Sequence, residues 1–576
     1  MQHLDKRRQR QFLLLLFLMF IASLAEIISI GSVLPFLGIL TDPVKVYQHS
    51  LMQPIIQILS ITKPSELMLP VTILFITAAL LAGLIRLTLL YTMTRLSFAT
   101  GADLSINIYR RTLYQEYEVH VLRSSSEIIN GIITKTSSVI GGVISPTLNL
   151  ISSTILFTGI IIALFTINPL IALSASLSFG ILYLMVIYFT KTHLKSNSKT
   201  IADQSTQMIK SLQEGLGAIR EVLIDGSQQF YCKNYRNADL ALRRASGNNQ
   251  FINGSPRFIM EAVGMVIIAL LAYIITQQNN GVSSAIPVLG ALALGVQRLL
   301  PALQQAYASY SAIKGAKSSF EDVMILLNQP LPKYADQPLP EPIPFEKEIK
   351  INNLGFRYTK GSPWVLRHVN LTLKKGSRTG FMGVTGSGKS TLLDIIIGLL
   401  KPTEGELVID NQKIKNKNHR SWQAHIAHVS QSIYLSDSTI LENIAFGVEK
   451  KLIDYQRVKK AAQQAQIADS IELWKDGYET FVGERGVRLS GGQRQRIGIA
   501  RALYKQADVL IFDEATSALD NETELAVMDA IENLSEDLTI LIVAHRLTTL
   551  KKCDQIIKLK ENHTIHMGSY EEIFNE

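Results

Sequence analysis

The chain has 576 residues and a formal net charge of +9; 47% of its residues are hydrophobic and only 18% are charged. This length is too great for one domain, and the charged fraction is below the quarter that is usual in soluble proteins. Cys232 and Cys553 stand far apart, which excludes a disulfide framework and a cysteine-based zinc site. The basic surplus suits loops that face anionic lipid, so we expect no nucleic-acid partner.

Long apolar runs fill the chain up to about residue 310. Each is long enough to cross a hydrocarbon core of about 30 Å, which takes roughly 20 helical residues. We predict six membrane-spanning helices, near Phe12 to Leu40, Leu69 to Met93, Ile132 to Thr166, Leu170 to Phe189, Phe258 to Thr276 and Ser284 to Tyr307. The first run is too long for a signal peptide and has no cleavage site, so we expect a multi-pass integral membrane protein.

The loops between these runs indicate the orientation. Most basic residues follow the second and fourth runs, so those sides are predicted to be cytoplasmic. Both segments have helical periodicity and should extend the membrane helices, with inward turns near Gln115 to Ser126 and Gly217 to Phe230 that a cytoplasmic domain can touch. On the outer side, Val44 to Ile61 has the spacing of a short interfacial helix.

Six prolines between Pro330 and Pro344 mark a domain boundary, because they break any helix. After them, short β-rich runs such as Ile351 to Tyr358 and Leu371 to Val384 alternate with helical patterns. The predicted fold is therefore an all-α, six-helix transmembrane domain over residues 1–328, a linker over 329–345 and an α/β P-loop domain over 346–576.

A glycine-rich loop with a lysine and a serine follows the predicted strand Arg378 to Gly383 and opens the helical run Thr391 to Leu400. In such a P-loop, backbone N–H groups wrap phosphates, the lysine reaches the β and γ phosphates and the serine ligates Mg²⁺. The predicted phosphate-binding residues are Gly383, Thr385, Gly386, Ser387, Gly388, Lys389, Ser390 and Thr391. The pattern is specific, because a plain structural turn needs neither the lysine nor the strand and helix around it.

Two further motifs agree with a nucleotide site. The apolar run Val509 to Asp513 ends in two carboxylates, of which Asp513 can hold Mg²⁺ and Glu514 can polarise the attacking water. Ser490, Gly491, Gly492 and Gln493 precede the helical run Arg494 to Tyr504, so they present N–H groups at a second helix N-terminus. We predict that this second start also grips phosphate.

In the order of these motifs, Ile349 to Glu576 resembles the nucleotide-binding domain of ATP-binding cassette (ABC) transporters. The resemblance implies ATP and Mg²⁺ as cofactors, and Mg²⁺ ligation by Ser390, Gln431 and Asp513. It also implies catalytic roles for Glu514, for Gln431 of the Q-loop and for His545 on the γ-phosphate. The remaining implied roles are adenine stacking by Tyr358, a transmission loop at Thr480 to Gly486 and a D-loop at Ser517 to Asp520.

The number of motifs per chain implies an assembly. The chain has one P-loop, Gly383 to Ser390, and one signature motif, Ser490 to Gln493. In the resembling fold the two motifs lie on separate faces of the domain. Each nucleotide would then be held by two chains, so we expect a homodimer or a pair with a closely related half-transporter. Six spans ahead of one cassette are similar to exporters of a bacterial inner membrane with cytoplasmic cassettes.

The cargo is indicated only by ionisable residues in the apolar runs. Arg86, Arg257 and Arg298 lie in or beside predicted spans, where charges usually face an interior path, although they can also snorkel or pair with Glu26 or Glu261. If the three arginines line a cavity, they suit the phosphate or pyrophosphate of an amphiphile.

The short external helix and the run from Gln297 to Leu303 resemble bacterial flippases for lipid-linked oligosaccharides. The resemblance implies ATP-driven flipping of such a lipid. A multidrug or peptide exporter is the alternative. An ATP-gated channel is disfavoured, because Glu514 and His545 predict hydrolysis.

Overall fold

The computed structural model describes residues 3–41, 43–49, 52–58, 61–167, 169–276, 282–384, 386–514, 521–532, 537–543, 550–560 and 565–574. The chain forms two compact units. One comprises Met1–Gln115 and Leu122–Pro332, and the other comprises Glu116–Val121 and Lys333–Glu576. The change from one unit to the other at Pro332 falls within the proline-rich segment.

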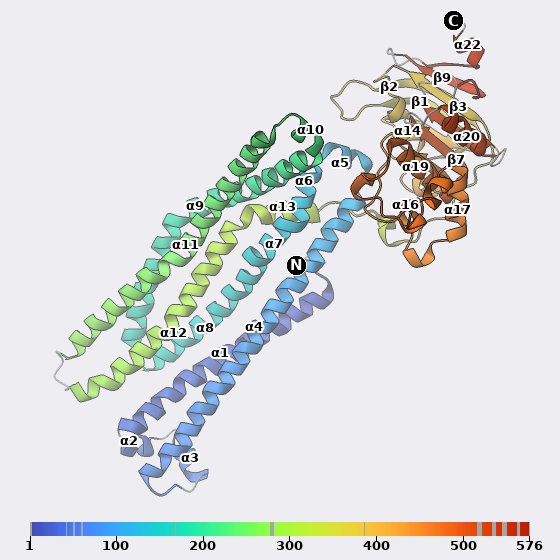
Figure 1. Ribbon diagram of the computed structural model, residues 1–576. Coiled ribbons are helices and arrows are strands. Elements are labelled where there is room, and N and C mark those ends of the chain that lie inside the picture. The colour runs from blue at the N-terminus through green and yellow to red at the C-terminus, as the bar shows by residue number, and fades with distance from the viewer. Residues whose placement is uncertain are drawn as a thin grey trace. The chain divides into compact units, whose positions relative to one another are not determined.

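The first unit is built from long helices (Figure 1). These are α1 (Lys6–Thr41), α4 (Met68–Leu113), α8 (Ser145–Ile167), α9 (Pro169–Gly217), α11 (Gln228–Thr276) and α12 (Val282–Gly315). Shorter helical pieces join them: α2 (Pro43–Gln48), α3 (Gln53–Ile58), η2 (Pro64–Leu67), α5 (Tyr117–Leu122), α6 (Ser125–Asn130), η3 (Gly131–Lys135), α7 (Thr136–Val139), η4 (Ile140–Ile144), α10 (Ile219–Ile224) and α13 (Lys317–Leu327). The predicted outer helix and both inward turns coincide with such short helices.

Three helical stretches among the described residues are long and apolar enough to cross a membrane: Lys6–Leu40, Pro64–Leu113 and Ser125–Ala163. They contain the first two predicted spans and the third up to Ala163. The other three predicted spans fall on α9, α11 and α12, and their passage through the membrane stays a prediction.

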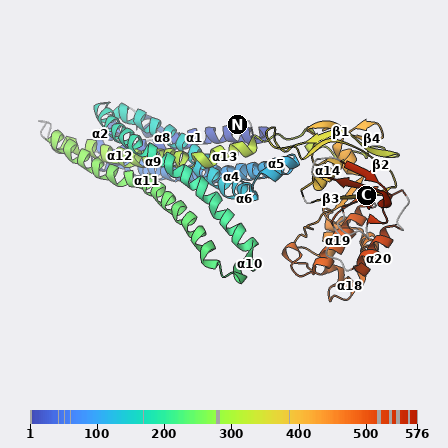
Figure 2. The ribbon, with the colours of Figure 1, turned by 90° about the horizontal axis from the view of Figure 1, so that it is seen from above.

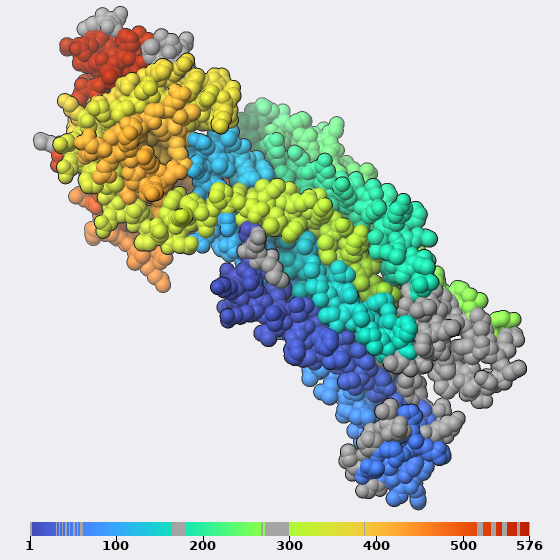
Figure 3. All heavy atoms as spheres, turned by 180° about the vertical axis from the view of Figure 1, so that it is seen from behind, coloured from blue at the N-terminus to red at the C-terminus, as the bar shows by residue number. Residues whose placement is uncertain are grey.

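Helix pairs in this unit pack along much of their length. Helices α9 and α11 lie side by side and are joined through α10, as both ribbon views show (Figures 1 and 2). In the space-filling view, α1 in dark blue lies against α8 in cyan (Figure 3). Leu15 and Met19 of α1 pack with Leu89, Met93 and Leu96 of α4. Many leucines on the opposite faces stay exposed, as expected of helices surrounded by lipid.

The second unit holds two sheets. The smaller is antiparallel in the order β2-β1-β4-β5, with β1 (Glu348–Phe356), β2 (Leu366–Lys374), β4 (Glu404–Ile409) and β5 (Gln412–Lys413). The larger runs β10-β9-β3-β8-β7-β6, with β3 (Arg378–Gly383), β6 (Ile426–Val429), β7 (Val509–Asp513), β8 (Thr539–Val543), β9 (Gln555–Leu559) and β10 (Ile565–Gly568). Its inner strands are parallel and only β10 is antiparallel to its neighbour, which confirms the predicted α/β class.

Helices surround this larger sheet. They are α14 (Lys389–Ile396), α15 (His419–Gln423), α16 (Ile440–Ile444), α17 (Tyr455–Gln464), α18 (Ala468–Glu472), α19 (Gly491–Lys505), α20 (Asn521–Glu532) and α22 (Tyr570–Phe574), with 3₁₀ turns η5 (Lys333–Asp336), η6 (Lys450–Leu452), η7 (Gly477–Glu479) and η8 (Glu484–Gly486). Because β3, β7 and β8 are parallel, their carboxyl ends meet at one edge of the sheet, and ligands bind such edges. The predicted nucleotide residues follow β3 and β7.

Candidate functional site

The loop between β3 and α14 has a backbone that requires glycine. Gly386 and Gly388 adopt φ of +85° and +94°, in the left-handed region that side chains rarely enter. A side chain at Gly383 would meet the Leu559 carbonyl oxygen at 2.5 Å. The Lys389 Nζ donates hydrogen bonds to the carbonyl oxygens of Gly383 at 2.8 Å and Val384 at 3.1 Å. The lysine charge is thereby held across the mouth of the loop.

The hydroxyl of Ser387 indicates what this loop accepts. The Ser387 Oγ is buried and makes no hydrogen bond to any residue that the structure describes. An unmet buried hydroxyl costs about 1–3 kcal/mol, and a phosphate oxygen in the loop would remove that cost. Together with Lys389 and the N-terminus of α14, the loop fits a phosphate. Thr385 lies outside the described residues.

The carboxylates Asp513 and Glu514 stand at the end of β7, beside the loop. Glu514 has φ of +50°, and its N–H donates to the Val543 carbonyl oxygen of β8 at 3.1 Å. The Gln431 Nε2 donates to the Glu514 Oε2 at 2.7 Å. Burial raises the pKa of Asp513, the negative charge of Glu514 raises it further, and Lys389 opposes both effects. The structure therefore brings Gln431, Asp513, Glu514 and Lys389 together.

Asp394 of α14 is a further acidic group that our sequence analysis missed. Burial raises its pKa to about 6, and the negative charge of Asp513 contributes to the same shift. The sequence feature that could have indicated Asp394 is that it is the single carboxylate within the apolar stretch Leu392 to Ile396. A half-buried acid this close to Asp513 makes the negative potential behind the phosphate loop dependent on pH.

The short segment Glu116–Val121 belongs to the same compact unit as this site. Lys401 forms an ion pair with Glu116. Burial raises the pKa of Tyr117, and the charge of Asp394 is the next cause. Glu116 and Tyr117 of the first predicted inward turn thus lie near Lys401 and Asp394.

Tyr358 was predicted to stack on adenine. Its hydroxyl lies 3.4 Å from the Thr391 Oγ1, so the ring is beside α14. One edge packs against Phe356 with ring centroids 5.0 Å apart, and 37% of the residue stays exposed. The position suits a base next to the phosphate loop, and the stacking stays a prediction.

The signature residues begin α19 as a capping box. The Ser490 Oγ accepts from the Gln493 N–H at 3.2 Å, and the Gln493 Oε1 accepts from the Ser490 N–H at 2.9 Å. Gly491 and Gly492 add no side chain to this first turn. Helix α19 packs on β6, three strands from β3 in the sheet and hence about 14 Å away. The two predicted phosphate grips therefore stand on strands that are not neighbours in the sheet.

Two predicted elements lie outside the described residues. They are His545 and the D-loop from Ser517 to Asp520. The contact of His545 with the γ-phosphate stays a prediction.

Of the three arginines predicted to line a substrate cavity, the structure describes the side chains of Arg86 and Arg257. Arg86 lies 3.4 Å from the carboxylate of Glu26, a residue only 5% exposed. Arg257 pairs with Glu261 one turn further along α11, at 2.8 Å. The side chain of Arg298 lies outside the described part of the structure. Arg86 and Arg257 thus each have a carboxylate partner, as our alternative interpretation allowed, and their substrate roles stay untested.

Arg257 does line a cavity of about 550 Å³ among the long helices. Polar residues from four helices share its wall: Asn149 of α8, Tyr183 of α9, Asn253 of α11, and Gln304 and Tyr307 of α12. The Tyr183 hydroxyl, Asn253 Oδ1 and Gln304 Nε2 are buried and have no hydrogen-bond partner among the residues described. Sequence analysis missed them because it searched the apolar runs for charges and not for amides or hydroxyls.

The phosphate loop, the acidic end of β7 and the capped signature helix define a P-loop ATPase, joined here to a helical membrane domain. Family comparison agrees: residues 366–517 match the ABC transporter family and residues 11–288 match the ABC transporter transmembrane region. The chain belongs to the ABC transporters, as a half-transporter of the exporter type. It is a membrane protein with a cytoplasmic cassette that couples ATP binding and hydrolysis to transport.

Among similar proteins is the ATP-dependent lipid A-core flippase of Cupriavidus metallidurans, 26% identical over 87% of this chain and 84% of its own length. The flippase of that name from Aliivibrio fischeri is 40% identical over 39% of each chain. A solved bacterial Atm1-family ABC exporter with ATP bound shares the fold, with a TM-score of 0.79, 23% identity and coverage of 99% of this chain and 96% of the other.

Proposed function

We propose that this exporter flips an anionic amphiphilic lipid across the membrane, and we favour a lipid-linked oligosaccharide such as a polyprenyl pyrophosphate glycan. The observation that carries the proposal is the polar cavity around Arg257, Asn253 and Gln304 within otherwise apolar helices. Relatives named as ATP-dependent lipid A-core flippases support a lipid cargo as well.

The chemistry of the cavity suits a polar head group on an apolar tail. Guanidinium groups bind phosphate with paired hydrogen bonds, and amides and phenols bind sugar hydroxyls. The unmet groups of Tyr183, Asn253 and Gln304 each cost about 1–3 kcal/mol until a ligand satisfies them. The exposed apolar faces of the helices leave an acyl or prenyl tail in lipid.

We infer that Mg²⁺ accompanies ATP, since a serine hydroxyl, an amide and a carboxylate at Ser390, Gln431 and Asp513 offer the oxygen ligands it prefers. When bound, Mg²⁺ neutralises phosphate charge. Lys389 and the loop N–H groups hold the phosphates. Glu514, oriented by the amide of Gln431, polarises the attacking water.

We also infer a homodimer, because the phosphate loop follows β3 and the signature helix α19 packs on β6, three strands away in the sheet, so that each nucleotide is held by two chains. Lys389→Ala and Ser490→Arg chains each form homodimers with two damaged sites. Mixed chains regain one intact site in each heterodimer, so occluded nucleotide should reappear only in the mixture. If the mixture traps no more nucleotide than its parents, assembly in trans is wrong.

The cargo is tested with purified protein in lipid vesicles. A polyprenyl pyrophosphate glycan, a lipid A-type glycolipid, an uncharged amphiphilic drug and a peptide mixture are compared for stimulation of ATPase activity and for movement between leaflets. We expect stimulation by the first two and none by the drug. Stimulation by the drug alone would replace our proposal with a multidrug exporter, and stimulation by peptides alone would replace it with a peptide exporter.

Two arginines of α11 provide matched variants. Arg257 pairs with Glu261 at 2.8 Å and lines the cavity, whereas Arg243 pairs with Asp239 at 3.1 Å and does not. We expect Arg257→Gln to reduce lipid stimulation by roughly tenfold, equivalent to losing one charge-assisted contact. Arg243→Gln should leave it unchanged, and basal ATPase should survive in both. The predicted roles of Arg86 and Arg298 are tested in the same assay. The variants are Arg298→Glu and a triple variant in which Arg86, Arg257 and Arg298 are each replaced by glutamine.

A further inference from the structure

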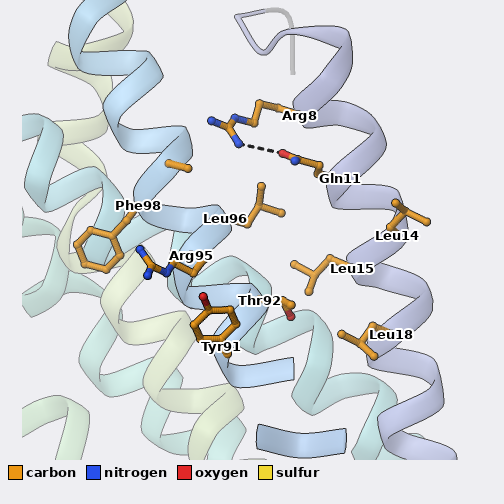
Figure 4. Close-up of a pocket in the computed structure, with 11 residues that line it drawn as sticks. Arg8, Gln11, Leu14, Leu15, Leu18, Tyr91, Thr92, Arg95, Leu96 and Phe98 are labelled. Atoms are coloured by element: carbon orange, nitrogen blue, oxygen red, sulfur yellow. Dashed lines mark hydrogen bonds between the residues drawn. The ribbon is translucent and has the colours of Figure 1, made fainter. Parts of the chain in front are cut away.

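A separate cavity of about 550 Å³ lies between α1 and α4 (Figure 4). Leucines and aromatic rings form most of its wall, and the charged residues of the wall are two arginines. The lining residues are Arg8, Gln11, Leu14, Leu15, Leu18, Tyr91, Thr92, Arg95, Leu96, Phe98 and Ala99. It shares no residue with the cavity around Arg257.

The two arginines of this cavity, called the groove from here on, differ in whether a carboxylate neutralises their charge. The Arg8 Nε lies 2.7 Å from the Asp103 carboxylate, and its Nη1 donates to the Gln11 Oε1 at 2.9 Å. The Arg95 guanidinium lies over the Tyr91 ring, 5.5 Å from its centroid, and no carboxylate of the described chain lies within ion-pair distance of it. A cation in an apolar wall without an acidic partner favours an anionic ligand.

The depth of the groove follows from the register of the two helices. Arg8 meets Asp103 and Glu26 meets Arg86, so α1 and α4 run antiparallel at a nearly constant register. Arg95 precedes Asp103 by eight residues, which places it about 12 Å deeper than Arg8 along the helix axis. Leu14, Leu15 and Leu18 line the groove beside and beyond Arg95 (Figure 4).

We propose that this groove binds one anionic glycerophospholipid of the cytoplasmic leaflet. Its phosphate lies at the guanidinium group of Arg95, the rest of the head group extends toward Arg8, and an acyl chain follows the leucines of α1. Charge complementarity supports this occupant, because the cytoplasmic leaflet carries anionic lipids and the adjacent first turn of α1 adds Lys6, Arg7 and Arg10. The inference does not depend on which cargo the exporter moves.

The distribution of tryptophan allows a direct test. The native tryptophans, Trp364, Trp422 and Trp474, all belong to the cassette unit. Phe98 lines the groove and is 62% exposed, so Phe98→Trp places a reporter there. Leu13 is 68% exposed and does not line the groove, and the register puts it level with Phe98, so Leu13→Trp is a control of matched depth.

Full-length protein is placed in bilayers with rising fractions of phosphatidylglycerol or phosphatidylcholine whose chains carry bromine, which quenches tryptophan. With Phe98→Trp, we expect half-maximal quenching at an about fivefold lower fraction of phosphatidylglycerol, the preference that one arginine near the surface provides. Adding Arg95→Gln should abolish the preference, Arg95→Lys should retain part of it, and Leu13→Trp should show none.

Equal quenching of the Phe98→Trp protein by both lipids would overturn the proposal, because the groove would then be an ordinary lipid-facing surface. Quenching by neither lipid would also overturn it and would indicate that a second copy of the chain covers the groove. ATPase activity and elution as a single species verify that each variant is folded. The comparison of the two lipids in the Phe98→Trp protein remains decisive if Arg95→Gln does not fold.

Discussion

The phosphate loop and the cavity around Arg257 are both polar sites, but they differ in how far apart their residues lie in the chain. One continuous stretch from Gly383 to Thr391 forms the loop and fixes its own shape through positive φ angles and the bonds of Lys389. The cavity takes Tyr183, Asn253 and Gln304 from three helices. A local site can be perturbed one group at a time, whereas a site between helices also depends on how those helices pack.

The largest expected effect is a loss of ATP turnover when Glu514, the carboxylate beside the phosphate loop, is replaced. Glu514→Gln should keep ATP binding and lower turnover by at least about a hundredfold, because the amide preserves shape without polarising water. Steady-state ATPase and equilibrium nucleotide binding measure this, with the exposed Glu571→Gln as control. Near-normal turnover would remove Glu514 from catalysis.

The next largest effect is a loss of ATP affinity, and two lysines distinguish it from a loss of stability. Lys389→Ala should weaken ATP binding by roughly 10- to 100-fold, the value of one charge-assisted bond. Lys505 also donates to backbone carbonyls, those of Gln423 and Ile426, but it lies at the far end of α19. Lys505→Ala should therefore lower the melting temperature and leave ATP affinity unchanged. Equal ATP affinity in wild type and Lys389→Ala would contradict the loop assignment.

Two tyrosines test the cavity. The Tyr307 hydroxyl donates to the Ile252 carbonyl oxygen at 3.2 Å, whereas the Tyr183 hydroxyl has no partner among the described residues. Tyr307→Phe should cost about 1 kcal/mol of stability, and Tyr183→Phe should cost nothing or stabilise the protein. Thermal unfolding in detergent, with and without lipid cargo, measures both. Equal losses would show that a bound water or ligand already satisfies Tyr183.

The smallest effect concerns Asp394. Its pKa in the folded protein is about 6, above the unfolded value near 3.8, so the folded state holds the proton more tightly. Stability from this group is full at low pH and falls as pH rises through about 6. Asp394→Asn should therefore raise the melting temperature relative to wild type at about pH 7.5 and much less at about pH 4. The exposed Asp476→Asn should show no such pH dependence, and the same pattern in both variants would refute the assignment.

The sequence by itself determined the parts of this protein that are local. Strands β3 and β7 begin and end where the sequence predicts, because parallel strands buried on both faces need mostly apolar residues. The phosphate loop could be predicted because its glycines, lysine and serine act through backbone geometry within one turn. The order of the motifs sufficed for the class of protein.

Only the tertiary structure decided which distant groups meet. It paired Arg86 with Glu26 and placed Arg95 in a leucine-lined groove, where no carboxylate among the described residues pairs with it. It also placed the carboxylate of Asp394 close enough to Asp513 to feel its charge. The physical reason is that charges and unmet polar groups act over a few ångströms, and helix packing, which no local pattern encodes, sets those distances.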